Sequence, residues 1–251
     1  MKIVVIGATG LIGSRLVKLL SQERHEVVAA SRTSGVDIIT GAGLNEAMSG
    51  AQIVIDVSNS SLYEPQAVME FFQTSTRNLM EAARAAGVRH HVLLSIVGVG
   101  RVPGQAYYQA KAAQERLVEA SNTPYTIVRS TQFFEFLPAI ANATADGHVV
   151  KLPKSLLQPI AADDVAILVG EFALADPVNG TVCIAGPERA SFKDVISRYL
   201  KSVGDQREVV QDAEARYFGG LLEDKSLVPL GLARLGEMTL DDWMGRSYKD
   251  T

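Results

Sequence analysis

The sequence has one cysteine, Cys183, among 251 residues, so no intramolecular disulfide can form. Cys183 lies in the strand-like run 181–184, where a cysteine usually acts as a small buried hydrophobic residue, so we expect no reactive thiol there. The four histidines are not arranged as metal ligands. His90 and His91 are adjacent near the start of an expected strand and would point to opposite faces of a sheet. We therefore predict no metal site.

The sequence also has no excess of basic residues. Its 24 Lys and Arg against 28 Asp and Glu give a formal net charge of −4, and no basic run could follow a phosphate backbone. We expect no direct nucleic-acid partner. No apolar run approaches the roughly eighteen residues that span a bilayer, and the chain enters an expected strand at once, which leaves no room for a signal peptide. We therefore expect a globular cytoplasmic protein without a membrane partner.

The first thirteen residues combine a buried strand, a glycine-rich turn and the start of a helix. Residues 3–6 are a β-branched run typical of a strand buried on both faces of a parallel sheet. Three glycines follow at intervals of three, and the leucines of residues 11–20 have the period of an amphipathic helix. Because glycines let a backbone approach a pyrophosphate and a helix N-terminus supplies N–H donors, we predict a dinucleotide site. The expected contact residues are Gly7, Thr9, Gly10, Leu11, Ile12 and Gly13.

The end of the next expected strand, residues 26–31, indicates which dinucleotide binds. In dinucleotide folds an Asp or Glu near this position accepts a hydrogen bond from the adenosine ribose 2′-hydroxyl, whereas an arginine can pair with a 2′-phosphate. This sequence has Ser31 followed by Arg32, and both can donate to a phosphate. We therefore favour NADP(H) over NAD(H) as the cofactor. The alternative is that Arg32 is a solvated surface residue.

Strand-like and helical segments alternate over the first 130 residues, which predicts an α/β fold with a doubly wound parallel sheet. In such sheets ligands lie at the carboxyl ends of strands, so Val57 and Ser58, which end one apolar run, should line the cofactor. The expected strands are residues 3–6, 26–31, 53–57, 91–96 and 125–129 with a weak one at 36–39, and the expected helices are 11–22, 65–86 and 105–120 with a short helical or turn segment at 41–50.

The alternation stops at about residue 130. Residues 132–138 are aromatic and irregular, and helices expected at 163–175 and 191–202 flank a strand at 181–185. We predict a dinucleotide-binding domain at 1–130 and a smaller, intertwined, substrate-facing lobe at 131–251. Within this lobe, Gln132 to Phe136 should cover the nicotinamide end of the cofactor, unless the phenylalanines are ordinary core residues. Asp163 and Asp164 are expected to cap the helix that follows them.

Tyr107 and Lys111 are the strongest candidates for chemistry. They stand four residues apart on an expected helix, so their side chains share one face, and Ser95 ends the preceding strand. Hydride transfer to a carbonyl leaves an alkoxide that needs a proton, and a phenol can supply it when a nearby ammonium lowers its pKa. Tyr108 competes for this role but has Ala112, and no lysine, four residues later.

Taken together, the glycines at 7, 10 and 13, the Tyr107-x-x-x-Lys111 pair after a strand ending in Ser95, and the segment 159–165 resemble the atypical short-chain dehydrogenase/reductases of the NmrA-like, NAD(P)H-binding type. The resemblance covers essentially the whole chain. It implies a Rossmann-type sheet, with Tyr107 as proton donor, Lys111 as the residue that holds the nicotinamide ribose and tunes the phenol, and Ser95 as the group that polarises the substrate carbonyl. NmrA-like relatives also include regulators that bind the cofactor without turning it over.

The leading hypothesis is an NADPH-dependent oxidoreductase, a monomer or homodimer, that reduces a carbonyl, quinone or enone of a small molecule. The alternative is a redox sensor that binds NADP(H) and reports its state to a partner protein. A third hypothesis, an epimerase-type enzyme, is less favoured because the second lobe is short for a nucleotide-sugar site. Ser95 has no G-x-S-x-G around it, which argues against a hydrolase.

Overall fold

The computed structural model describes residues 1–62 and 64–247. Seven strands form a mostly parallel sheet in the order β12-β9-β5-β4-β3-β1-β2. The strand β1 (Lys2–Ile6) pairs in parallel with β2 (Glu26–Ala30) and with β3 (Ile53–Asp56), which pairs in parallel with β4 (His90–Ile96). The remaining strands are β5 (Tyr125–Ser130), β9 (Gly180–Ala185) and β12 (Arg234–Leu235). The chain passes from the edge strand β2 across β1 to β3, and such a switch in strand order is where open α/β sheets bind ligands.

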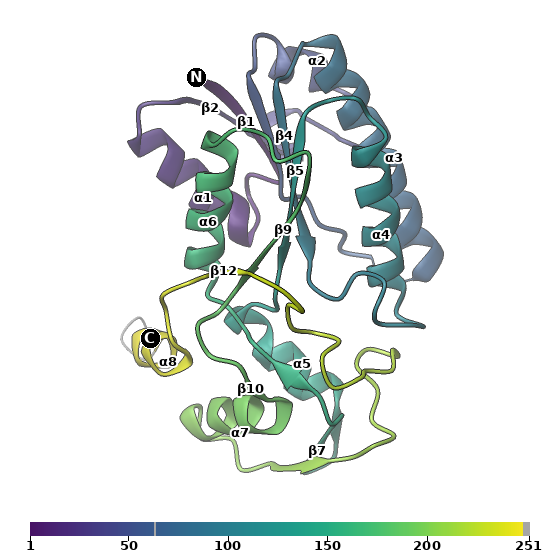
Figure 1. Cartoon of the computed structure of the whole chain (residues 1–251), viewed down its shortest axis with the longest axis vertical. Coiled ribbons are helices and arrows are strands. Elements are labelled where there is room, and N and C mark those ends of the chain that lie inside the picture. Colours follow the sequence, from purple (N-terminus) through teal and green to yellow (C-terminus); the bar gives the residue numbers. More distant parts are fainter. Residues whose placement is uncertain (63, 248–251) are drawn as a thin grey trace. The chain divides into compact units, whose positions relative to one another are not determined.

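Helices cover both faces of this sheet, as a doubly wound fold requires. Figure 1 shows α1 (Leu11–Gln22) and α6 (Ala162–Leu174) along one side of the strands, and α3 (Pro65–Ala85) and α4 (Ala106–Glu119) along the other. Gly170 lets α6 approach α1 closely, because a Cβ there would lie 3.3 Å from a methyl group of Leu19. The predicted α/β fold is therefore confirmed.

Local sequence explains where these elements begin and end. The strands β1 and β3 are buried almost throughout, which fits their β-branched runs. The helix α3 begins with Pro65, whose missing N–H costs nothing in the first turn, and it is followed by Gly87, which adopts a φ of +69°. Leu79 and Ala83 of α3 pack with Val4 of β1 in one hydrophobic core, as the helical period predicts.

The chain divides into two compact units that interleave along the sequence. We call them the first unit and the second unit. Most of α6 belongs to the first unit, although it lies in the second half of the sequence. The first unit comprises residues 1–95, 109–129 and 165–182, and the second comprises 96–108, 130–164 and the chain from 183 onward.

The second unit has its own core around two helices, α5 (Leu137–Ala143) and α7 (Phe192–Ser202), labelled in Figure 1. Leu137, Ile140 and Phe192 are fully buried in it. Its smaller sheets have the orders β11-β7-β6 and β10-β8. The further elements are the 3-10 helix η2 (Phe134–Phe136), β6 (Ala145–Asp146), β7 (Val149–Leu152), β8 (Leu156–Leu157), β10 (Ala190–Ser191), β11 (Glu208–Gln211) and α8 (Leu240–Ser247).

The weak strand predicted at residues 36–39 is wrong, because side chains bind this backbone locally. Asp37 Oδ1 accepts hydrogen bonds from the N–H groups of Ile39 and Thr40, and Asn78 of α3 donates to the carbonyls of Ile38 and Ile39. Such bonds satisfy the groups that a strand ladder would use. The short helix α2 (Leu44–Met48) follows, as the helical alternative for residues 41–50 predicts.

The expectation that Asp163 and Asp164 cap a helix is also wrong, because α6 already begins at Ala162 and both lie in its first turn. Asp164 Oδ2 instead accepts a hydrogen bond from the N–H of Met238. Over the described ranges, no helix has both the length and the apolar character needed to pass through a membrane.

Candidate dinucleotide site

The glycine turn, residues 7–13, connects β1 to α1, and each of its glycines has a different structural reason. Gly7 has a φ of +79°, and a Cβ on it would lie 3.0 Å from the backbone of Ser58, so the turn closes against the end of β3. A Cβ on Gly13 would overlap the carbonyl oxygen of Gly7, so α1 can begin this close to the turn only with glycine there. Gly10 has ordinary dihedrals, and a Cβ there would meet a single backbone atom, the carbonyl oxygen of Gly7 at 3.2 Å, so a side chain at this position requires only a small local shift.

The start of α1 has donors without a side-chain cap. Gly10 is the N-cap and provides no side-chain hydrogen bond, and the first turn contains no acidic residue. Backbone N–H groups of the first helical turn therefore face outward with the positive end of the helix dipole. Thr9, Gly10 and Leu11 are exposed, whereas Ile12 and Gly13 are buried. This combination of donors and a missing side chain at Gly10 fits a phosphate group.

A buried hydroxyl lies against this turn. Ser58 follows β3, and its N–H donates to Asp56 Oδ1 at 2.9 Å. Its Oγ is buried and has no hydrogen-bond partner within the described parts of the chain. Native proteins rarely leave a buried hydroxyl unsatisfied, so a group absent from the protein itself fits at this position. Val57, the neighbouring residue, is half-buried and donates its N–H to Ile6.

The end of β2 lies beside the same turn, because Ala30 O accepts hydrogen bonds from Gly7 N at 3.1 Å and Ala8 N at 3.3 Å. Ser31 follows and caps a short 3-10 helix, η1 (Arg32–Ser34), with its N–H donating to Ser34 Oγ. The Arg32 side chain is exposed, and residues 31–36 include no carboxylate. An exposed cation therefore lies directly after β2, and the first carboxylate of this loop, Asp37, accepts hydrogen bonds from the N–H groups of Ile39 and Thr40.

Ser95 has an internal partner. Its Oγ donates to Glu115 Oε1 of α4 at 2.5 Å, and Arg129 of β5 binds both oxygens of that carboxylate, through Nε at 2.9 Å and through a second nitrogen at 2.5 Å. Glu115 is buried, so the two-point ion pair offsets the cost of desolvating its charge. A hydroxyl has one hydrogen, so in this arrangement Ser95 cannot also donate to a substrate carbonyl.

Lys111 is likewise held inside the first unit. Its Nζ donates to the carbonyl of Leu94 at 2.9 Å and to Gln114 Oε1, and lies 4.8 Å from the ring centre of Phe72. Gln114 in turn donates to Asp56 Oδ2 at 3.1 Å. Burial lowers the Lys111 pKa from its ordinary 10.5 to about 8, against the opposing attraction of Asp56 and Glu115. The lysine is thus the end of a buried chain of polar groups that leads to the end of β3.

Tyr107 belongs to the second unit and is half-buried beside its core. Burial raises its pKa, which is the opposite of the direction that the resemblance implies for a proton donor tuned by lysine. Its ring lies 6.4 Å from that of Tyr108, edge to face. Tyr108 is buried and its hydroxyl accepts a hydrogen bond from Gln132 Nε2 at 3.0 Å. Gln132 Oε1 is buried without a partner among the residues that the structure describes.

The structure thus brings several of the predicted cofactor residues together, whereas the predicted catalytic ones are divided between the two units. The carboxyl ends of β1 and β3 bring together Gly7, Gly13 and Ser58, beside the end of β2. Ser95 and Lys111 lie in the first unit but bind different partners, and Tyr107 lies in the second. Sequence reasoning missed Glu115, Gln114 and Arg129. The i, i+4 spacing of Lys111 and Glu115 on α4 signals that Glu115 shares a face with the lysine.

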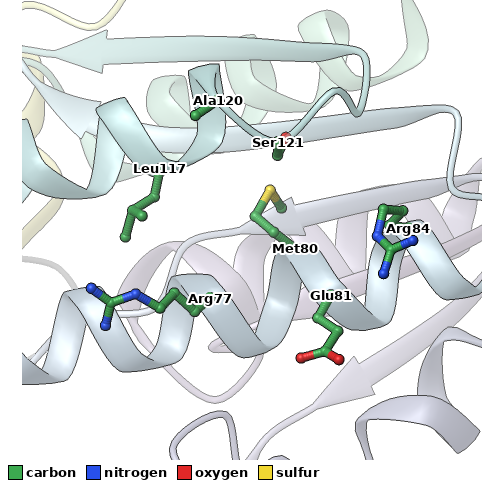
Figure 2. A pocket seen from close by; sticks show the side chains of 7 residues that line it. All are labelled: Arg77, Met80, Glu81, Arg84, Leu117, Ala120 and Ser121. Atoms are coloured by element: carbon green, nitrogen blue, oxygen red, sulfur yellow. The ribbon is translucent and has the colours of Figure 1, made fainter.

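A surface hollow of about 280 Å³ lies between α3 and α4, away from the carboxyl ends of the strands. Figure 2 shows Met80 of α3 pointing toward Ala120 and Ser121, whereas Glu81 points away. The lining residues that belong to α3 lie in the second half of this helix, which is about 30 Å long and follows β3 in the chain, and the others lie at the end of α4 or just after it. The hollow therefore lies toward the amino ends of the parallel strands, opposite Ser58, and has no part in the predicted site.

Comparison with known proteins gives the same assignment for the fold. The structure resembles that of dTDP-4-dehydrorhamnose reductase from Bacillus anthracis in complex with NADP, with a TM-score of 0.73, 16% identity, and coverage of 100% of this chain and 99% of that one. It also resembles the dTDP-glucose 4,6-dehydratase DesIV from Streptomyces venezuelae, with a TM-score of 0.74, 16% identity, and coverage of 100% and 98%.

Two curated relatives are similar in sequence. Divinyl chlorophyllide a 8-vinyl-reductase of Cucumis sativus is 29% identical over 224 residues, which are 75% of this chain and 53% of the relative. Photosystem II assembly factor Ycf39 of Cyanophora paradoxa is 27% identical over 151 residues, which are 55% of this chain and 47% of the relative. The chain spans about half the length of these relatives.

A family model described as NAD(P)H-binding matches residues 7–170, which begin at the first glycine of the turn and end within α6. This match covers well over half of the chain. The protein is therefore a member of the NAD(P)H-binding, NmrA-like family of atypical short-chain dehydrogenase/reductases.

Proposed function

We propose that the protein is an NADPH-dependent oxidoreductase that reduces a carbonyl, quinone or enone of a small molecule. The observation that carries the proposal is the glycine turn, where an uncapped helix start, a position open at Gly10 and an unsatisfied Ser58 hydroxyl converge. In this proposal the first turn of α1 binds the pyrophosphate, and Ser31 and Arg32 bind a 2′-phosphate. The bound nicotinamide supplies a hydride to the acceptor.

Tyr107 is the proposed proton donor. Because burial raises its pKa, the phenol keeps its proton at neutral pH and is in the form that an acid needs. Lys111 is proposed to hold the nicotinamide ribose, which requires its ammonium to exchange Gln114 for ribose hydroxyls. We assign Ser95 a positioning role through Glu115 and Arg129, since its hydroxyl already donates to that carboxylate. A curated relative that is named as a reductase supports a reductase activity.

The competing proposal is a sensor that binds NADP(H) without turnover. It is favoured by the internal partners of Ser95 and Lys111, which leave neither group directed at a substrate. A second relative is named as an assembly factor, which also fits a binding role.

A turnover assay separates the two proposals. Quinones, enones and aldehydes are each incubated with the protein and NADPH, and NADPH oxidation is followed by absorbance. We expect turnover of at least one of them, reduced about 100-fold by Tyr107→Phe with unchanged NADPH affinity, because only a general acid is lost. Tyr108→Phe is the matched control and should retain turnover. Calorimetric binding of NADPH without any turnover would favour the sensor, and activity indifferent to Tyr107→Phe would remove Tyr107 from the mechanism.

A further inference from the structure

The second unit exposes two aromatic rings in a stacked pair. Phe136, at the end of η2, is 42% exposed, and Phe218 is 38% exposed. Their ring centres lie 5.7 Å apart with an angle of 27° between the planes. Leu221, three residues after Phe218, is also exposed. We call Phe136, Phe218 and Leu221 the aromatic shelf.

Phe218 is held in a backbone conformation that phenylalanine disfavours. Tyr217 and Gly220 exchange both backbone hydrogen bonds, at 2.9 and 3.0 Å, around a two-residue turn formed by Phe218 and Gly219. Phe218 has a φ of +47° and Gly219 of +85°, so both central residues are left-handed, as a type I′ turn requires. Asparagine or glycine is the usual first residue of such a turn, because a bulky side chain there is strained.

Packing alone does not explain why a strained phenylalanine is kept there. The ring touches Tyr217 edge to face with centres 4.9 Å apart, and Tyr217 is buried, but more than a third of Phe218 stays exposed. Gly220 fixes the turn against the loop before α4, because a Cβ there would lie 2.7 Å from Val102 Cγ1 and 2.9 Å from Gln105 Cβ. Strain that surrounding structure maintains, with the side chain directed at solvent, is typical of a functional site.

The shelf also adjoins the proposed proton donor within the second unit. Burial raises the pKa of Tyr217, the nearby phenol of Tyr107 raises it further, and Tyr217 is hydrogen-bonded to Tyr108. Gln105, against which the turn packs, precedes Tyr107 by two residues. A continuous set of aromatic groups therefore extends from Tyr107 through Tyr217 to the exposed rings.

We propose that the aromatic shelf binds the substrate, and that the substrate is a planar conjugated ring system. Stacked phenyl faces favour flat, polarisable rings over saturated ones of equal size. Three exposed side chains are also far too few for a stable protein interface, which buries about 800 Å² on each partner. This proposal narrows the substrate of the proposed oxidoreductase to a cyclic conjugated ketone or quinone. Binding of the ring does not depend on the proposed function, and only the reduction of the bound ring rests on it.

The test measures binding without turnover, so that it does not depend on the reductase activity. Isothermal titration compares 2-naphthol, which cannot be reduced by NADPH, with saturated decahydro-2-naphthol, on the protein with and without NADP⁺. We expect 2-naphthol to bind about tenfold more tightly, the scale of one stacked aromatic pair, and Phe136→Leu and Phe218→Asn each to remove most of that preference.

Phe218→Asn distinguishes a ligand site from damage to the fold. It creates an Asn-Gly turn that relieves the left-handed strain, so its melting temperature should be equal to or higher than that of the unmodified protein while ring binding is lost. Leu232→Asn, a change at a fully exposed leucine of the same unit, is the control and should alter neither. Equal binding of the two alcohols, or a preference that survives both phenylalanine variants, would overturn the proposal. If a phenylalanine variant lost a dimer in sedimentation velocity but still bound 2-naphthol with the same preference, the shelf would be a self-association surface. That result would also overturn the proposal.

Discussion

The glycine turn and the surroundings of Ser95 and Lys111 both lie in the first unit, and they differ in how their polar groups are satisfied. At the turn, the start of α1 has no side-chain cap and Ser58 Oγ has no partner within the described residues. Around Ser95 and Lys111, the hydroxyl and the ammonium are bonded to Glu115, Gln114 and the carbonyl of Leu94. The first region leaves polar groups without a partner in the described part of the protein, whereas the Ser95 hydroxyl and the Lys111 ammonium have partners within it.

The largest effect should come from filling the turn. Gly10→Val should abolish NADPH binding at a small cost in melting temperature, because its Cβ would press on only one backbone atom, at 3.2 Å, while its branched side chain occupies the phosphate position. Gly13→Val is the matched control: it should lose binding and also destabilise the protein by about 3 kcal/mol, because its Cβ overlaps backbone. Thermal melts with and without NADPH measure both. Stabilisation of Gly10→Val by NADPH would contradict the assignment.

Lys111 should show its buried state in the pH dependence of stability. Its pKa is about 8 in the folded protein against an ordinary 10.5, so between these values the unfolded chain holds a proton that the folded one lacks. Stability should therefore rise with pH across this window, by about 3 kcal/mol relative to Lys111→Met, and the penalty is fully present below it. Urea unfolding at several pH values measures the difference.

Lys193, exposed on α7, provides the control, and Lys193→Met should give no such window. The NADPH affinity of Lys111→Met tests separately whether Lys111 contacts the nicotinamide ribose. Weaker NADPH binding would support a contact with the ribose, whereas unchanged affinity would make Lys111 an internal structural cation and would sharpen the contrast with the glycine turn.

Arg32 extends the first region and should have a moderate effect. Arg32→Ala should weaken NADPH binding by about 2 kcal/mol and leave NADH nearly unaffected, because only the former carries the phosphate that the guanidinium would bind. Calorimetric titration with both cofactors measures it, and raised salt should diminish the difference because Arg32 is exposed. Equal losses for NADPH and NADH would contradict the preference for NADP(H).

The same contrast explains what the sequence could predict. Glycine spacing, β-branched runs and helical periods are local, so residues 1–22 could be assigned almost to the residue, and α3 and α4 nearly so. The segment 36–39 could not, because Asn78, forty residues later, binds its carbonyls. The sequence predicts the elements that carry Ser95 and Lys111, but the partners of these side chains depend on how α4 packs on the sheet. A motif predicts the element on which a residue lies, but it does not predict which groups its side chain contacts in the folded protein.

The smallest effect is expected for Ser95. It shows whether the Ser95 hydroxyl stays bonded to Glu115 or turns to a substrate. Ser95→Ala removes one hydrogen bond to a carboxylate that keeps both contacts with Arg129, so stability should fall by only about 1 kcal/mol. Turnover of an accepted substrate should stay within a few-fold if Ser95 only positions Glu115. A serine that polarises the carbonyl would instead cost about 100-fold, as loss of an oxyanion donor does. Ser95→Thr, which keeps a hydroxyl, separates the two: recovery of a 100-fold loss would mean that Ser95 leaves Glu115 for the substrate.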